Sequence, residues 1–330
     1  MRKLLCITDL GTHPAFDTTV ALYHSWATHD NIELYHANAS EITSTETVTT
    51  YLVNGALSYE DFRAIETTES IAMPVESFDL IFLRTDKPYP GQLLEVCSQW
   101  EGKVAFVNLA SATLAIETRV FLHTIAKKFL APSILANTVE EALAFSIKRS
   151  KFIVKMNRSY GGKGVYLIES QSNSAIVKNV MSDDISFSDN RSALEYIWQQ
   201  SNGPFEVCAY LERASEGDKR IIVVEDQIYG AYIRRSSGNT WVNNISQGGY
   251  AELCEVLPHE EEIIRQTAPE YTSRGMKTLG YDFLQDNDGV WTLTEINAGN
   301  IGGYNRLEDL GVTGTINRFT DWLFTIPTKQ

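Results

Sequence analysis

The chain has 330 residues, of which 43% are hydrophobic and 21% are charged, and its formal net charge is −14 at pH 7. This length allows two or three domains with buried cores, and the negative charge argues against a broad nucleic-acid or anionic-membrane surface, because both need basic patches. No run approaches the ~20 apolar residues of a membrane helix, and Asp9 follows the start too closely for a signal peptide. We therefore expect a cytoplasmic protein.

Residues 1 to about 115 alternate short apolar runs with amphipathic segments, which predicts a parallel sheet covered by helices. Ligands of such sheets meet the loops beyond the carboxyl ends of the strands. In one of these loops Asp17 is expected to cap the following helix. Arg84 ends the apolar strand 80–83, where it could hold a ligand carboxylate by two hydrogen bonds or pair locally with Asp86. Both interpretations of Arg84 stay open.

A glycine-rich loop, residues 156–164, joins two predicted strands. Its glycines let the backbone approach a phosphate and aim N–H groups at it; they are Gly161, Gly162 and Gly164. The spacing is neither that of a P-loop nor that of a dinucleotide-binding fingerprint, and a plain hairpin turn is the alternative. Lys155 precedes the loop and favours phosphate binding, because its charge could neutralise the same anion.

Residues 173–190 are polar and predict a surface connection. Beyond residue 204, successive apolar strands joined by short turns predict an antiparallel sheet and therefore a change of domain. Arg220 begins one of these strands, and Arg234 and Arg235 end another. Three arginines at strand ends could gather an anion, or they could be solvated edge charges.

The following segment, residues 236–249, is rich in Ser, Asn and Gly and could form a lid over a site.

Two apolar runs flank the turn Asp286-Asn287-Asp288-Gly289 and predict a β-hairpin. If residue 285 pairs with residue 290, Asp282 faces residue 293, and Glu295 and Asn297 follow on the same face. Carboxylates at close range repel unless a positive charge lies among them. Mg²⁺ takes such oxygen ligands, so the hairpin predicts a magnesium site, with a solvated polar face as the alternative.

Taken in order, these motifs resemble the ATP-grasp superfamily, and within it the bacterial glutathione synthetases. The resemblance covers nearly the whole chain and is clearest from Phe106 to about Leu310. It is carried by Lys155 before Tyr160-Gly161-Gly162-Lys163-Gly164, Glu216-Gly217-Asp218-Lys219-Arg220, Asn243-Asn244-Ile245-Ser246-Gln247-Gly248-Gly249, and Gly280-Tyr281-Asp282 with Leu293-Thr294-Glu295-Ile296-Asn297.

The resemblance implies an α/β fold in three parts. The first is an open parallel-sheet, Rossmann-like domain for substrate at residues 1–116. A two-lobed ATP-grasp fold with antiparallel sheets follows, with the small lobe and its glycine-rich loop at residues 117–203. The C-terminal lobe with the metal site occupies residues 204–330.

The resemblance also implies roles for individual residues. The magnesium ligands would be Asp282, Glu295 and Asn297, and ATP would be bound by Arg119, Lys155, Gly161, Gly162, Gly164, Tyr210, Leu211 and Asp218. Arg220 and Arg234 would be the catalytic arginines around the transferred phosphate and the acyl group. We expect Arg84, Asn300, Gly302 and Gly303 to border the substrate.

The implied activity is that of an ATP-dependent carboxylate–amine ligase that acts through an acyl phosphate and releases ADP and phosphate. Its cofactors would be ATP and Mg²⁺, with two ions expected and Mn²⁺ as an alternative. Its partners would be amino-acid or peptide substrates and copies of itself in a dimer or tetramer, without nucleic acid or membrane.

The turn from Ala298 to Arg306 lacks the Ser-Pro of bacterial glutathione synthetases, and the predicted lid carries Trp241-Val242. A ligase for another amino-acid or peptide pair, a small-molecule kinase on the same scaffold, and a nucleotide-binding protein without turnover are therefore the alternatives.

Overall fold

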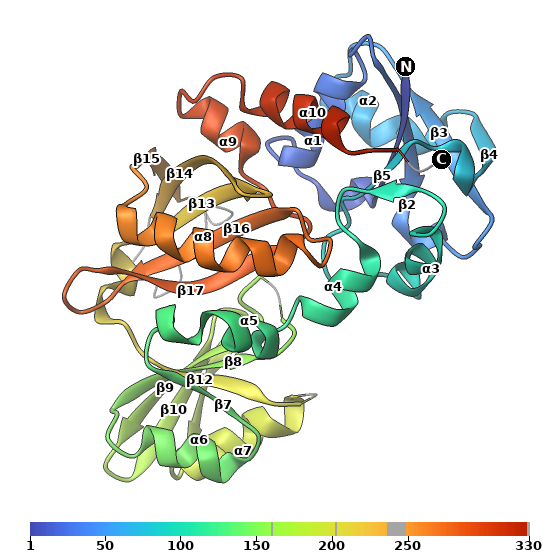
Figure 1. Cartoon of the computed structure of the whole chain (residues 1–330). Coiled ribbons are helices and arrows are strands. Elements are labelled where there is room, and N and C mark those ends of the chain that lie inside the picture. Colours follow the sequence, from blue (N-terminus) through green and yellow to red (C-terminus); the bar gives the residue numbers. More distant parts are fainter. Residues whose placement is uncertain (160, 202, 236–248, 329–330) are drawn as a thin grey trace.

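The computed structural model describes residues 1–159, 161–201, 203–235 and 249–328 (Figure 1). These residues form three β-sheets that are covered by helices. Within the same ranges, none of the helices combines the length and the apolar character that crossing a lipid bilayer requires.

The first sheet has the strand order β4-β3-β2-β1-β5-β6. Its strands are β1 (Arg2–Thr8), β2 (Ile32–Asn38), β3 (Thr47–Val53), β4 (Ser70–Pro74), β5 (Leu80–Leu83) and β6 (Ala105–Phe106). β1 runs parallel to β2 and β5, and β5 runs parallel to β6, whereas β3 and β4 pair antiparallel. The predicted parallel sheet is thus confirmed at its centre. The helices of this part are α1 (Thr18–Trp26), α2 (Tyr59–Ala64), α3 (Leu93–Trp100) and α4 (Ala110–Ile116).

The second sheet is antiparallel and has the order β11-β10-β9-β8-β12-β7. Its strands are β7 (Ser133–Ala136), β8 (Lys151–Met156), β9 (Val165–Gln171), β10 (Ser174–Asn179), β11 (Ser182–Phe187) and β12 (Phe205–Ala209). α6 (Val139–Ser146) and α7 (Asn190–Gln200) pack on it, and α5 (Arg119–Ala126) leads into it.

The prediction of a surface connection at residues 173–190 is wrong, because β10 and β11 form there. β10 has only one short apolar run, Ala175-Ile176-Val177, of which Ala175 and Val177 are buried, and β11 begins with Ser182-Asp183-Asp184. A half-buried strand near a sheet edge needs only such sparse apolar residues.

The third sheet has the order β15-β14-β13-β16-β17, with antiparallel neighbours as predicted. Its strands are β13 (Asp218–Val224), β14 (Gln227–Arg235), β15 (Tyr250–Leu253), β16 (Thr278–Gln285) and β17 (Trp291–Ala298). α8 (Pro258–Thr272) covers one face. α9 (Tyr304–Asp309) and α10 (Thr315–Thr325) return to the first sheet, where α10 lies beside α1 (Figure 1). There Trp26 Nε1 donates a hydrogen bond to Thr320 Oγ1 at 2.9 Å. The predicted domain boundaries stay a prediction.

The hairpin β16–β17 forms in a register that differs from the predicted one. Asp282 lies opposite Glu295 rather than residue 293, because Gln285 pairs with Trp291 and the register shifts again between Asp282 and Phe283. The first offset comes from the longer turn, in which Gly289 adopts a φ of 82°. A single one-residue offset would place Asp282 on the opposite face of the sheet from Glu295 and Asn297. The two offsets together return Asp282 to the same face as these residues. The two carboxylates are therefore direct neighbours across the strands.

A buried ion pair fixes α8 to the third sheet. Lys219 Nζ on β13 lies 2.6 Å from Glu260 Oε2, and the two residues are 1% and 0% exposed. We expect Lys219→Met to lower the free energy of unfolding by about 3–5 kcal/mol, because it leaves the Glu260 carboxylate buried without its partner. Urea unfolding measures the loss. The double variant Lys219→Met/Glu260→Gln should recover most of it, and a loss as large in the double variant would contradict this explanation.

Candidate active site

A cavity of about 320 Å³ lies between the second and third sheets. Its lining includes the predicted ATP, metal and catalytic residues apart from Gly164: Arg119, Lys155, Gly161, Gly162, Tyr210, Leu211, Asp218, Arg220, Arg234, Asp282, Glu295 and Asn297. These residues come from widely separated parts of the chain. The fold thus brings the sequence-predicted set together at one place.

One part of the cavity wall is apolar. It is formed by Leu130, Ala131, Ile153, Cys208, Leu284 and Leu293. β12 ends at Ala209, so the backbone of Tyr210 and Leu211 leaves the sheet beside this wall. An apolar wall with backbone polar groups at its edge suits a planar heterocycle such as adenine.

The glycine-rich loop between β8 and β9 borders the cavity through Gly161 and Gly162. Both residues have positive φ values, 57° and 78°, which L side chains rarely adopt. Gly164 acts at the base of the loop, where a Cβ atom would lie 2.4 Å from the Cβ of Ser159. Residue 160 and the predicted lid at residues 236–248 lie outside the described residues.

Glu206 on β12 is the centre of a buried charge cluster beside the loop, and the residue is 2% exposed. Its Oε1 accepts a hydrogen bond from His123 Nε2 at 3.0 Å, and its Oε2 lies 3.6 Å from Arg119 Nη1 and 4.0 Å from Lys155 Nζ. Burial alone would raise the pKa of Glu206, but Lys155, His123 and Arg119 outweigh it and lower the pKa to about 2. The carboxylate therefore holds both predicted phosphate-binding cations.

Arg119 connects this cluster to the metal hairpin. Its Nη2 donates to Glu295 Oε1 at 2.9 Å, and its Nη1 donates to the Thr294 carbonyl at 3.0 Å. Lys155 Nζ reaches the same carbonyl at 3.3 Å. The cations thus join the second sheet to β17 of the third sheet.

Glu206 and His123 did not emerge from the sequence. The available signal was weak: Glu206 is a single acid within the apolar run Phe205–Ala209, and His123 lies on the buried face of α5. Their contact spans 83 positions in the sequence. It therefore requires the packing of α5 on β12 to be known.

We expect Glu206→Gln to raise the KM for ATP about tenfold, because Arg119 and Lys155 lose the charge that holds them. The change should also lower the free energy of unfolding at pH 7 by about 1–3 kcal/mol. The pKa of Glu206 is about 2, below the value of about 4.3 for an unfolded glutamate. Its ionisation thus stabilises the fold above about pH 4.3, and this contribution is lost as the pH falls toward 2.

Urea unfolding as a function of pH and the KM for ATP check this prediction. The exposed Glu212, which follows the same strand, is the matched control as Glu212→Gln. A difference in stability between Glu206→Gln and the unsubstituted protein that stays constant from pH 5 to pH 3 would contradict it.

The predicted metal ligands lie together on β16 and β17. Asp282 is bound by Arg220 Nη2 at 2.8 Å, Arg234 Nη2 at 3.1 Å and Asn297 Nδ2 at 2.8 Å. Burial alone would raise the pKa of Asp282, but the two arginines outweigh it and keep its pKa below the ordinary value. Across the strands, the Glu295 side chain is 38% exposed.

The donors fit Mg²⁺, which uses one or two protein carboxylates and leaves its other positions to phosphate and water. Asp282 and Glu295 supply two adjacent carboxylates, and Asn297 supplies an amide oxygen. Among the described residues, no group of three or more His, Cys, Asp or Glu side chains is arranged to hold a metal ion without further ligands. The predicted site thus suits an ion that is shared with a phosphate ligand.

Asp218 faces Arg234 across β13 and β14, and its Oδ2 accepts a hydrogen bond from Arg234 Nη2 at 3.0 Å. Burial raises the pKa of Asp218, and Arg234 opposes this rise. Asp218, which was predicted to bind ATP, therefore orients Arg234 in this structure. Arg235, by contrast, pairs with Glu252 at 2.7 Å near the surface and matches the interpretation as an edge charge.

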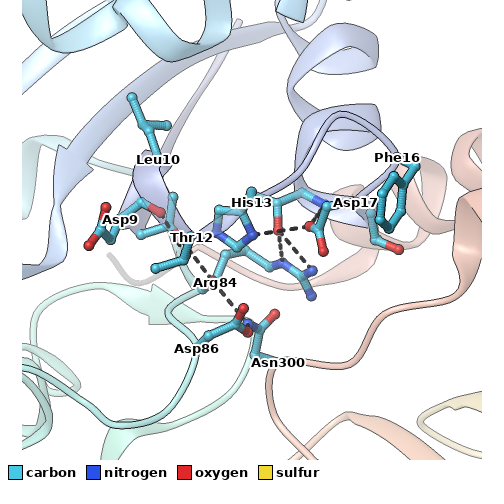
Figure 2. A network of polar contacts seen from close by, with 12 residues as sticks. Asp9, Leu10, Thr12, His13, Phe16, Asp17, Arg84, Asp86 and Asn300 are labelled. Atoms are coloured by element: carbon cyan, nitrogen blue, oxygen red, sulfur yellow. Dashed lines mark hydrogen bonds and ion pairs between the residues drawn. The ribbon is translucent and has the colours of Figure 1, made fainter. Parts of the chain in front are cut away.

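The four predicted substrate residues lie where the first sheet meets the turn after β17; Figure 2 shows Arg84 and Asn300 there, and Gly302 and Gly303 adjoin Thr18. Arg84 is 2% exposed and donates from Nη1 to the Ile301 carbonyl at 2.7 Å and from Nη2 to Thr19 Oγ1 at 3.0 Å. Asn300 Nδ2 donates to Asp86 Oδ1 at 2.5 Å. Arg84 thus holds the turn after β17, and Asp86 pairs with Asn300 rather than with Arg84, whereas a contact of Arg84 with a substrate carboxylate stays a prediction.

Gly303 is required by this turn. Its φ is 115°, its N–H donates to Thr18 Oγ1 at 2.9 Å, and a Cβ atom would lie 2.5 Å from the hydroxyl of Tyr232. Gly302 has more room, because its Cβ would lie 3.5 Å from Thr18 Oγ1. Asp17 caps α1 as predicted, accepting a hydrogen bond from Thr19 N at 2.6 Å.

Residues 119–311 match the model of the family described as "Prokaryotic glutathione synthetase, ATP-grasp domain", which is more than half of the chain. The chain belongs to this family. Proteins of the family use ATP and a divalent metal, Mg²⁺. This member is accordingly an ATP-grasp ligase, an ADP-forming carbon–nitrogen ligase that resembles glutathione synthetase.

The glutathione synthetases similar to this ATP-grasp ligase are distant in sequence. The protein of a Nostoc species is 25% identical over 327 residues, which cover 94% of this chain and 93% of that protein. The protein of Neisseria meningitidis is 24% identical over 322 residues, with 93% of each chain covered.

Solved structures agree with the ATP-grasp ligase in fold. The D-cycloserine synthetase DcsG has a TM-score of 0.63 at 11% identity and covers 97% of this chain and 99% of its own. D-alanyl-alanine synthetase A of Vibrio cholerae has a TM-score of 0.58 at 11% identity, with 96% and 98% covered. The predicted α/β fold with a parallel-centred first sheet and antiparallel later sheets is thereby confirmed.

Proposed function

We propose that the protein joins the carboxylate of an amino acid or peptide to an amine, in the manner of a glutathione synthetase. One observation carries the proposal: three arginines, one lysine and four carboxylates line a single cavity beside a glycine-rich loop. Arg119 and Lys155 would bind the ATP phosphates, and the apolar wall would hold adenine. Asp282, Glu295 and Asn297 would hold Mg²⁺, which supplies charge neutralisation between the β and γ phosphates.

The proposed reaction has two steps. A carboxylate oxygen of the donor bonds to the γ phosphorus as the bond to ADP breaks, and an acyl phosphate results. The amine nitrogen then bonds to the acyl carbon, phosphate leaves with the C–O electron pair, and the amine gives up a proton. Arg220 and Arg234 point into the cavity beside Asp282 and would stabilise the negative charge on the reacting oxygens. The chain then needs no side-chain nucleophile.

The turn after β17, which contacts Arg84, Asp86 and Thr18, would border the substrate pair. We propose an amino-acid or peptide pair, with γ-glutamylcysteine plus glycine as one member of the set to be tested. A second bound metal ion, Mn²⁺ in place of Mg²⁺, a homo-oligomeric state and a cytoplasmic location stay predictions from the sequence.

Phosphate release across a panel of substrates tests the proposal. Carboxylate donors comprise γ-glutamylcysteine, dipeptides and free amino acids, and amine acceptors comprise glycine and other amino acids. We expect phosphate and a condensed product only when both partners are present. A stable phosphorylated product without an amine requirement would instead identify a kinase.

A further inference from the structure

A second cavity, of about 300 Å³, lies beside the active site. It is formed by the loop after β5, by α3 and α4, and by the loop after β8. Figure 1 shows α4 leading from the first sheet toward α5. Its lining includes Lys87, Tyr89, Leu94, Glu95, Leu114, Glu117 and Arg158. Neither the sequence motifs nor the proposed roles assign a function to any of them.

This cavity adjoins the metal hairpin. Lys87 and Glu117 also line a narrow space of about 30 Å³, whose other walls include Arg119, Glu295 and Asn297. The narrow space therefore lies between the second cavity and the side of β17 that carries the predicted metal ligands. The amine of a substrate bound in the second cavity would approach those ligands through this space.

The polar groups of the second cavity are balanced in charge. Glu117 is largely buried, and its carboxylate lies 2.7 Å from Lys87 Nζ and accepts a hydrogen bond from the hydroxyl of Tyr89 at 3.1 Å. Arg158 is exposed, and its Nη2 donates to the Leu114 carbonyl at 2.5 Å, which uses one of the five N–H donors of a guanidinium. Glu95 is the remaining charged residue of the lining. Two cations and two carboxylates thus surround the space.

The remaining wall is apolar. Leu94 is 5% exposed, and Leu114 and the ring of Tyr89 lie beside it in the lining. A volume of 300 Å³ equals that of roughly ten water molecules at about 30 Å³ each. Glycine would leave a large part of this space empty, whereas a longer apolar side chain would fill it against the leucines.

We propose that this cavity binds the amine-supplying substrate, an α-amino acid with an apolar side chain larger than that of alanine. The guanidinium of Arg158 binds its carboxylate, Glu117 faces its amino group, and the side chain packs on Leu94 and Leu114. This inference rests on the proposed ligase function, because that function requires an amine beside the acyl phosphate.

Calorimetric binding to the full-length protein with ADP and Mg²⁺ present tests the cavity without turnover. The probes are glycine, alanine, leucine, methionine and phenylalanine. At least one of the last three should bind ten or more times tighter than glycine. Its analogues without the carboxylate (the amino alcohol) and without the amine (the alkyl or aryl acid) should each bind at least tenfold weaker. Equal binding of the amino acid and both analogues would overturn the proposal.

Substitutions test whether the amino acid binds in this second cavity. Because Arg158 is exposed, Arg158→Ala should leave folding intact and weaken amino-acid binding at least tenfold, with Arg158→Lys recovering part of it. Arg265→Ala is the matched control, since Arg265 is exposed on α8 and remote from the cavity. Unchanged binding in Arg158→Ala would overturn the proposal. Tight binding of the amino acid without amide formation from any donor would instead refute the proposed ligase function. It would still support amino-acid binding in this cavity.

Discussion

Arg234→Ala is expected to lower kcat by about 10²–10³-fold, the usual cost of removing one donor that stabilises a developing oxyanion. Arg234 is held by Asp218 and also contacts Asp282, so its guanidinium is fixed before substrates bind. Such a fixed group acts mainly on the transition state, and the KM for ATP should change much less than kcat. Steady-state kinetics with ATP varied at saturating donor and amine separates the two constants.

The neighbouring Arg235 provides the control for this experiment. It lies next in the chain, but it pairs with Glu252 near the surface and does not line the cavity. Arg235→Ala should therefore retain nearly full activity. Circular dichroism and thermal unfolding of Arg234→Ala check that the loss of the Asp218 partner has not unfolded the lobe. A change confined to the KM for ATP would contradict the catalytic role.

Glu295→Gln is expected to lower kcat by at least about 100-fold, in line with the upper range of losses on removing groups that support a metal site. The substitution keeps the shape of the side chain and removes the negative charge that would face Mg²⁺ beside Asp282. The Mg²⁺ concentration at half-maximal activity should rise together with the fall in kcat. Titration of activity with MgCl₂ at fixed ATP measures both.

Glu262→Gln, at a partly exposed glutamate on α8 that pairs with Arg265, is the matched control and should behave like the unsubstituted protein. Glu295 also accepts a hydrogen bond from Arg119, so a released Arg119 could alter nucleotide binding. Nucleotide affinity measured without metal distinguishes this effect from a metal effect. Near-normal turnover of Glu295→Gln at saturating Mg²⁺ would exclude Glu295 as a ligand.

Local patterns predicted much of the fold because they depend on nearby residues. Apolar runs located β1, β2, β5 and β6 of the first sheet and β13 and β14 of the third, and the Asp286–Gly289 turn located the β16–β17 hairpin, whereas β3, β4 and β15 were not predicted. The predicted register of that hairpin was wrong for two reasons that no local pattern specified. The turn is one residue longer than predicted, and the shift after Asp282 places one extra residue in β17. β10 and β11 were missed because their apolar residues are few, Ala175 to Val177 in one strand and Ile185 and Phe187 in the other, among polar neighbours.

The site divides in the same way. Lys155, the glycines and the hairpin carboxylates were found because motifs place them close in sequence. Glu206 and His123 were missed because their contact depends on how α5 packs on β12. Arg220 and Arg234 were predicted to gather an anion, and in the structure both donate hydrogen bonds to Asp282. The pairing of β13 with β14 and β16 brings these three residues together, and no local pattern in the sequence specified it.

Transfer of oxygen from the donor carboxylate to phosphate tests the central claim most directly. The donor is labelled with ¹⁸O on both carboxylate oxygens and incubated with ATP, Mg²⁺ and the amine. An acyl phosphate requires one labelled oxygen to leave with phosphate and the other to remain in the amide. Mass spectrometry should therefore find one ¹⁸O in each released phosphate per amide formed. Unlabelled phosphate, or label kept entirely by a phosphorylated donor that never forms an amide, would contradict the ligase mechanism.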